Sequence, residues 1–162
     1  MTASNSRADL DSLIDEFNAT RASLIAAATA VPPERRDVPF VGHWDLQDVI
    51  AHTVGWDYTN VEAIPDFAAG RLPAFFARYD ADWGSINAEL VACYRVEDWD
   101  ALMQTLRDAQ AAFVAALSDL NDTDLDRRAS WNGRQVSLRG MLRAISRDEA
   151  EHVRQIEAFL RS

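Results

Sequence analysis

The chain has 162 residues, of which 48% are hydrophobic and 26% charged, a balance typical of one globular domain with a substantial core, here spanning residues 1–162. Its net charge of −10 argues against nucleic acid and anionic membranes as partners, because both are bound through positive charge. All 16 basic residues are arginine, which excludes lysine chemistry such as a Schiff base.

The sequence gives no sign of export or of membrane insertion. Residues 1–9 are polar and predict no signal peptide, and no apolar run approaches the roughly 20 residues that a membrane helix needs. The single cysteine, Cys93, cannot form an internal disulfide, as expected in a reducing compartment. We therefore expect a cytoplasmic protein that acts on a small-molecule substrate. A homodimer is compatible with a helical bundle of this size, but no surface is indicated.

The first helix is predicted to begin after Ser6. Apolar residues then recur at helical spacing along one face, at Leu10, Leu13, Phe17, Leu24 and Ala28. The helix should end before Pro32, because a residue that precedes proline is displaced from helical conformation.

The second helix is predicted from Asp45 to the neighbourhood of Pro65. Asp45 is a favourable N-cap, and Asp48 adds a carboxylate to the first turn, where the helix dipole favours it. Residues 65–80 combine prolines and a glycine with many apolar side chains, which predicts a connection that packs over the domain. A link of this length can cross one end of a bundle, so the next helix need not be antiparallel.

The third helical stretch is predicted to begin near Asp82, to break at residues 96–98 and to resume from Trp99 to Leu120. The polar segment that follows contains Asn132-Gly133, the strongest short signal for a hairpin turn.

Ser137 can cap the last helix, which continues to the neighbourhood of Phe159. Apolar spacing is helical nearly throughout the chain, and no repeat is present. The predicted fold is all-α, a four-helix bundle with a long crossover link between its second and third helices.

Three residues on these helices form a candidate metal site: His52, Asp148 and His152. Positions i and i+4 lie above one another on a helix, so Asp148 and His152 can reach one ion, and His52 would join them from a neighbouring helix. Asp148 is expected on the inward face of the last helix. A buried carboxylate needs a partner, and a divalent ion would supply one.

Two alternatives remain open at this site. Asp148 and His152 could form a simple ion pair while His52 is a hydrogen-bonded core histidine. Glu149 could replace Asp148 as a ligand, accept a hydrogen bond from a ligand imidazole, or act as a general base. Glu149-x-x-His152 also matches the di-iron motif, but that site needs a second such pair, which neither His43 nor His52 provides.

Two further residues could line a pocket on the open side of the ion. Trp56 lies one turn beyond His52, and Asn87 is a polar residue on an otherwise apolar stripe. Either could instead belong to the ordinary core.

Two motifs carry a family resemblance. The segment from Gly42 to His52 resembles the Trp-x-x-x-Asp-x-x-x-His signature of the DinB/YfiT-like metalloenzyme superfamily, with Trp44, Asp48 and His52 at its fixed positions. The ending Asp148-Glu149-Ala150-Glu151-His152-Val153-Arg154-Gln155 is similar to that family's final helix, where His-x-x-x-His followed by Arg-x-Gln is common. The resemblance spans essentially the whole chain.

The chain departs from the commonest family pattern by placing Asp148 where the first histidine of the pair usually stands. A carboxylate at this position also occurs in the related mycothiol-dependent maleylpyruvate isomerase branch. The resemblance implies a divalent ion, zinc or nickel, held by His52, Asp148 and His152. It further implies a thiol-dependent S-transferase or isomerase that joins a low-molecular-weight thiol such as bacillithiol, mycothiol or glutathione to a small electrophile.

Two other functions stay open. One is a metal-dependent hydrolase, for which Glu149 would be the candidate general base. The other is a non-catalytic small-molecule binding or stress-associated protein whose metal site is degenerate, an alternative that Asp148 keeps open.

Overall fold

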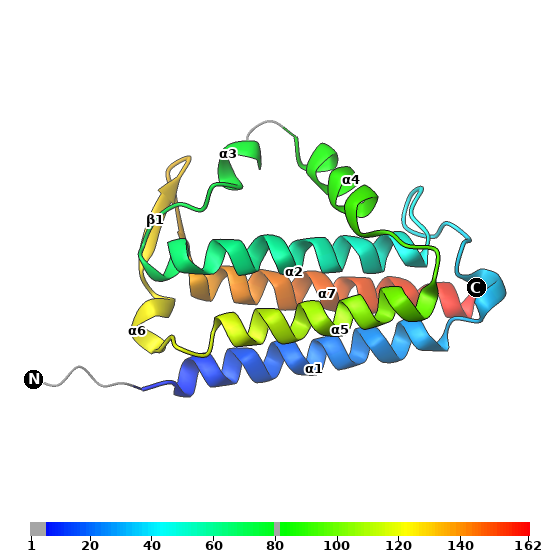
Figure 1. Ribbon diagram of the computed structural model, residues 1–162, viewed down its shortest axis with the longest axis horizontal. Coiled ribbons are helices and arrows are strands. Elements are labelled where there is room, and N and C mark those ends of the chain that lie inside the picture. The colour runs from blue at the N-terminus through cyan, green and yellow to red at the C-terminus, as the bar shows by residue number, and fades with distance from the viewer. Residues whose placement is uncertain (1–5, 80–81) are drawn as a thin grey trace, which may run out of the picture.

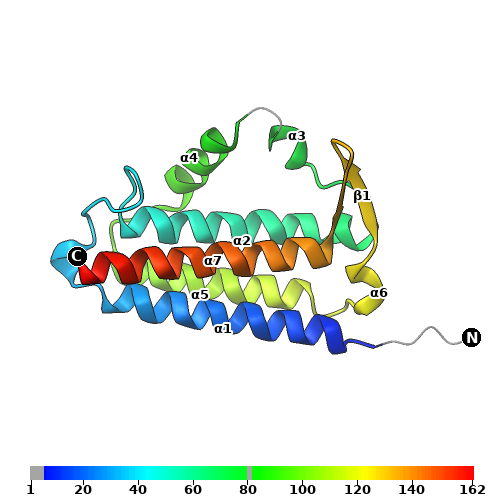
Figure 2. The ribbon, with the colours of Figure 1, turned by 180° about the vertical axis from the view of Figure 1, so that it is seen from behind.

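The computed structural model describes the chain except residues 1–5 and 80–81. Four long helices lie side by side: α1 (Ala8–Ala30), α2 (Leu46–Ala68), α5 (Trp99–Ala116) and α7 (Leu138–Arg161) (Figure 1). Helices α1 and α7 run in one direction, and α2 and α5 run in the other, as both views of the ribbon show (Figures 1 and 2). The prediction of a four-helix bundle with a long crossover link is therefore confirmed.

The parallel arrangement of α2 and α5 follows from the link between them. After α2 the chain forms the short helix α3 (Phe76–Tyr79) and then α4 (Trp83–Tyr94), which passes back over α2 before α5 begins (Figure 1). Gly55 permits the close approach of α4 to α2, because a Cβ atom there would lie 2.7 Å from the Cβ of Leu90.

The prediction that the second helix stops near Pro65 is wrong, because α2 continues to Ala68 and includes that proline. Pro65 stands in the last turn, where the loss of a single backbone hydrogen bond is offset by tertiary contacts. Ile64 and Phe67, on either side of it, are each only 2% exposed in the core.

The predicted start of α2 is confirmed. The Asp45 carboxylate accepts from the backbone N–H of Asp48, and the Asp48 carboxylate accepts from the N–H of Asp45, so both form a reciprocal capping box. Arg95, in the connection between α4 and α5, pairs with both carboxylates. This cluster fixes the first turn of the helix that carries His52.

The predicted hairpin is also confirmed. Strand β1 (Arg128–Trp131) pairs antiparallel with β2 (Arg134–Ser137), and Asn132 and Gly133 between them adopt φ values of 49° and 76°. Such left-handed values at both positions are what a tight two-residue turn requires. Ser137 then caps α7 by accepting from the N–H of Gly140, as predicted.

Two short helical turns complete the described structure: η1 (Pro33–Arg35) after α1, and α6 (Asp122–Leu125) before the hairpin. No helix in the described ranges, 6–79 and 82–162, has both the length and the hydropathy that spanning a membrane would demand.

The apolar core consists of two clusters along the bundle axis. One contains Phe17, Phe67 and Phe113, and the other contains Leu24, Leu106 and Ile156. Between them, in three of the four long helices, lie buried polar residues: Arg21 in α1, Asp57 and Asn60 in α2, and Ser146, Glu149 and His152 in α7. A polar layer therefore crosses the middle of the bundle, and the candidate site belongs to it.

Candidate metal centre

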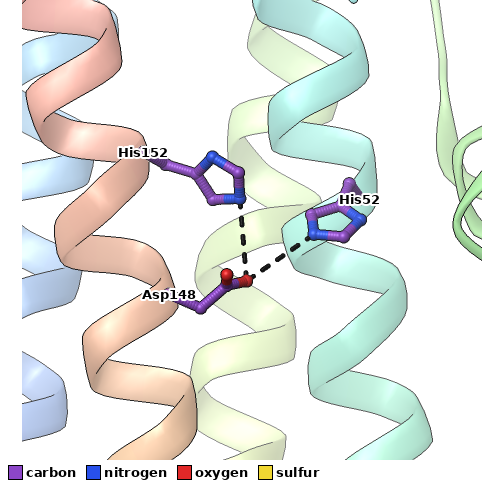
Figure 3. A group of neighbouring side chains, drawn as sticks. All are labelled: His52, Asp148 and His152. Atoms are coloured by element: carbon purple, nitrogen blue, oxygen red, sulfur yellow. Dashed lines mark ion pairs between the residues drawn. The ribbon is translucent and has the colours of Figure 1, made fainter. Parts of the chain in front are cut away.

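The three predicted ligands come together from two helices. His52 projects from α2, and Asp148 and His152 project from adjacent turns of α7 (Figure 3). Asp148 Oδ2 lies 3.8 Å from His52 Nε2 and 3.7 Å from His152 Nε2, and one ligand atom of each residue lies within 4.8 Å of the others. We refer to these residues as the histidine triad.

The hydrogen bonding of His152 leaves one nitrogen directed at the triad. Its Nδ1 lies 2.9 Å from Oε1 of Gln155, and an amide oxygen can only accept, so Nδ1 carries the proton. In the neutral tautomer with this proton, Nε2 carries a lone pair, and the atom is buried with no hydrogen-bond partner among the described residues. A buried lone pair of this kind is suited to a cation.

His52 is also buried, with a side chain 7% exposed. Burial, aided by the neighbouring His152, lowers its pKa, and Asp148 opposes this effect. The imidazole is therefore neutral near pH 7 and can offer a nitrogen to a cation. Trp44 packs against it with a centroid separation of 4.9 Å, which excludes water from that side.

Asp148 does not lie where the sequence pattern placed it. The prediction of a buried carboxylate is wrong for this residue, because the side chain is 64% exposed at the edge of the apolar face of α7. The interaction with His52 holds the pKa of Asp148 below its usual value, so the carboxylate is ionised at neutral pH. The acid that α7 does bury is the next residue, Glu149, which is 3% exposed.

Glu149 belongs to a second cluster, which we call the arginine triad: Arg21, Asp57 and Glu149. Nε and Nη2 of Arg21 donate to the two oxygens of Glu149, while Nη1 and Nη2 donate to the two oxygens of Asp57 at 2.8 and 3.0 Å. All three residues are at most 3% exposed. Both oxygens of Glu149 accept from Arg21, and Glu149 makes no hydrogen bond to His52 or His152.

The arginine triad joins three helices within the polar layer. Burial raises the pKa of Asp57 to about 6, against the opposing attraction of Arg21. The pKa of Arg21 is raised despite the opposing effect of its burial, through its bonds and charges with Glu149 and Asp57. Arg21 therefore remains a cation, and the cluster links α1, α2 and α7 beside the histidine triad.

A cavity of about 1030 Å³ opens beside the histidine triad, and the triad lies on its wall. Both predicted lining residues, Trp56 and Asn87, contribute to this wall, and the Trp56 indole donates to Oδ1 of Asn87 at 3.0 Å. His43 is exposed in the turn before α2 and is absent from the cavity lining.

The donor set and its spacing fit a divalent ion. Two ligands at tetrahedral positions on zinc, each at about 2.0–2.1 Å, lie about 3.4 Å apart. The spacing of 3.7 and 3.8 Å from Asp148 to the two imidazoles is close to this value, and all three ligand atoms lie within 4.8 Å of one another. Two imidazoles and a carboxylate suit zinc, nickel and similar ions. The histidine triad can therefore hold a metal ion, with coordination positions left for a water or a substrate atom.

Fold and site together define a helical-bundle protein with a candidate metal centre. The DinB superfamily pattern matches residues 16–156, and the chain belongs to the DinB superfamily. Among curated proteins, none matches the chain.

Two solved structures share the fold. An uncharacterised protein from Escherichia coli UTI89 aligns with a TM-score of 0.73 at 21% identity, covering 98% of this chain and 94% of that one. YfiT from Bacillus subtilis, described as a probable metal-dependent hydrolase with an unusual four-helix bundle topology, aligns with a TM-score of 0.69 at 16% identity. That alignment covers 99% of this chain and 91% of YfiT.

Sequence reasoning did not identify Arg21, Asp57 or Trp44 as parts of the site. A signal for Arg21 exists: the apolar stripe of α1 steps from Phe17 to Leu24, and the skipped position on that face is Arg21. No comparable signal marks Asp57, whose burial depends on Arg21 from another helix.

Proposed function

We propose that this protein is a divalent-metal-dependent enzyme that activates a low-molecular-weight thiol for attack on a small electrophile bound in the cavity. The observation that carries the proposal is the buried Nε2 of His152, which has no hydrogen-bond partner among the described residues and is directed at Asp148 and His52 beside an open cavity. A bound divalent ion supplies Lewis acidity, which lowers the pKa of a thiol or of water near it.

The residues around the ion have separable tasks. His52, Asp148 and His152 hold it, and Gln155 fixes the proton of His152 on Nδ1 so that Nε2 faces the triad. Trp44 and Trp56, with centroids 4.9 and 6.4 Å from the His52 ring, restrict water near this ligand. Substrate would enter from the cavity side, where Asp148 is exposed.

The choice of a thiol over water rests on the carboxylates of the cavity wall. Glu149 and Asp57 are engaged by Arg21, Glu151 is paired with Arg154, and Asp148 is itself a ligand candidate. None of the described carboxylates on the wall is therefore left over as a general base for water. A thiol bound to a divalent ion loses its proton near neutral pH without such a base.

A metal-dependent hydrolase is the second candidate. It is favoured by the fold shared with YfiT of Bacillus subtilis, which is described as a probable metal-dependent hydrolase. Water bound to zinc can itself reach a pKa near 7, so hydrolysis needs only a modest further contribution from the protein.

The test uses protein stripped of metal and then reconstituted with zinc or nickel. A generic aryl halide electrophile is offered with glutathione, mycothiol or bacillithiol, and an activated ester is offered without thiol. The proposal expects metal-dependent and thiol-dependent conjugation that is lost in His152→Ala and retained in His43→Ala. Ester hydrolysis without thiol would establish the hydrolase instead. Stoichiometric metal with neither activity would overturn both candidates in favour of a non-catalytic binding protein.

A further inference from the structure

The cavity extends well beyond the histidine triad. Along α7 its wall runs from Arg154 back to Gly140, a span of 14 residues or about 21 Å of helix. On α2 it runs from His52 to Phe67, and the hairpin contributes Trp131 and Val136. Its volume of about 1030 Å³ lies at the upper end of the range for small-molecule sites.

A continuous row of aromatic rings follows this wall away from the triad. Successive ring centroids are separated by 6.4 Å from His52 to Trp56, 6.1 Å from Trp56 to Phe75, 4.5 Å from Phe75 to Phe76 and 5.0 Å from Phe76 to Trp131. Met141 and Ile145 of α7 also line the cavity. The ligand-facing surface is therefore polar at the triad and aromatic toward the hairpin, a combination that suits an apolar or aromatic body.

The charges on the wall are unequally compensated. Three described arginines line the cavity: Arg134 on β2, and Arg147 and Arg154 on α7. Arg154 is paired with Glu151, whereas no hydrogen bond or ion pair joins Arg134 or Arg147 to another described residue. Arg147 acts on Asp148 only through a longer-range attraction, which helps to lower the pKa of that carboxyl. Two cationic groups without an ion-pair partner in the described part of the chain therefore lie on one cavity wall, in a chain of net charge −10.

From these features we infer that the cavity binds an amphipathic anion, with an apolar or aromatic body along the aromatic row and an acidic group at one of the two exposed arginines of the wall, Arg134 or Arg147. A guanidinium binds carboxylate and sulfonate oxygens through paired N–H groups. The protein's own carboxylates on the cavity wall already interact with other side chains, so the acidic group would come from the ligand. This inference rests on the proposed function only for the part of the ligand that would react at the histidine triad. The acidic group and the apolar body of the ligand are recognised by other residues.

Two naphthalene probes isolate the anionic group. 8-Anilinonaphthalene-1-sulfonate and N-phenyl-1-naphthylamine share an aromatic body and differ by the sulfonate. Tryptophans 44, 56, 83 and 131 line the cavity, so quenching of their fluorescence reports binding of either probe to the folded protein. Each probe is titrated against metal-free and zinc-loaded protein.

The wild type is expected to bind one equivalent of the sulfonate probe more tightly than the neutral probe. Arg134→Gln/Arg147→Gln should weaken the sulfonate probe about tenfold and change the neutral probe less than twofold. Arg143→Gln is the matched control, because Arg143 is an exposed arginine of the same helix that does not line the cavity. It should change neither probe. Ala144→Trp, on the cavity wall, should weaken both.

The inference is overturned if the two probes bind equally, if Arg143→Gln acts like the double variant, or if Ala144→Trp leaves both affinities unchanged. The proposal of a metal-dependent enzyme is tested separately, and it is refuted if the wild-type protein binds no divalent metal. If the probes bind as expected but the protein binds no metal, the inferred ligand class stands and the proposed enzyme is refuted. If the protein binds metal but the probes do not bind as expected, the inferred ligand class is refuted and the proposed enzyme stands.

Discussion

Two clusters of charged and titratable residues lie next to each other in the polar layer of this bundle, and they differ in how completely they are satisfied. In the arginine triad every carboxylate oxygen accepts from Arg21, and exposure is at most 3%. In the histidine triad Oδ2 of Asp148 lies 3.7–3.8 Å from a nitrogen of each imidazole, Nε2 of His152 has no hydrogen-bond partner among the described residues, and Asp148 is exposed.

The difference separates structure from function within one layer. A fully bonded, buried ion cluster has no capacity left for a ligand, so its contribution is to fix three helices relative to one another. A cluster with an unused buried lone pair and an open side has that capacity. Two consecutive residues of α7 therefore have different roles: Asp148 belongs to the candidate metal site, and Glu149 belongs to the structural ion cluster.

The largest expected effect is on the arginine triad. Arg21→Met leaves two buried carboxylates without a counter-charge, and it should reduce the free energy of unfolding by about 3–5 kcal/mol. Urea denaturation of metal-free protein measures this. Arg154→Met, which breaks an exposed pair with Glu151, should cost at most about 1 kcal/mol. Equal losses in the two variants would refute the structural role of the buried cluster.

The same comparison can be sharpened by neutralising the cluster as a whole. Adding Asp57→Asn and Glu149→Gln to Arg21→Met removes the uncompensated charges, so the triple variant should recover most of the stability lost by the single one. A triple variant less stable than Arg21→Met would instead show that the carboxylates contribute through other contacts.

The second effect is a pH dependence specific to Asp57. Its folded-state pKa is raised to about 6 from the usual 3.8, so the protonated form is favoured by folding. The resulting stability is fully present below pH 4 and is lost as the pH rises through 6. Relative to Asp57→Asn, the wild type should therefore lose roughly 1–3 kcal/mol of unfolding free energy between pH 4 and 7. A difference that is flat or rises with pH would contradict the assignment.

The smallest effect concerns the support of the histidine triad. Gln155→Leu removes the acceptor that fixes the proton of His152, and it should weaken metal binding about tenfold. Gln155→Glu keeps an acceptor and should retain the affinity. Competition with a chromophoric chelator measures both values. An unchanged affinity in Gln155→Leu would mean that Gln155 does not orient the imidazole.

Local signals account for the parts of this structure that sequence could predict. The capping box at Asp45, the Asn132-Gly133 turn and the Ser137 cap each depend on residues within a few positions of one another. The long link and the helical stripes are likewise continuous patterns. The juxtaposition of His52 with Asp148 and His152 was predictable because it requires only two adjacent helices and one i, i+4 pair.

What sequence could not predict depends on the rotation of helices about their axes. Consecutive residues of a helix differ by about 100° in direction, so a small rotation of α7 decides whether Asp148 or Glu149 is buried. That rotation is coupled to Arg21 of α1, which lies 128 residues before Glu149 in the sequence. Arg21 in turn bonds to Asp57 of α2, which lies 36 residues after it. Such coupling is invisible to any pattern within one helix.

Cobalt(II) titration of the metal-free protein, followed by visible absorption, tests the central claim most directly. We expect one equivalent to bind the wild type and His43→Ala alike, and at least 100-fold weaker binding in His52→Ala and in His152→Ala. A His52→Ala variant that binds cobalt as the wild type does would contradict the claim that the two helices share one ion.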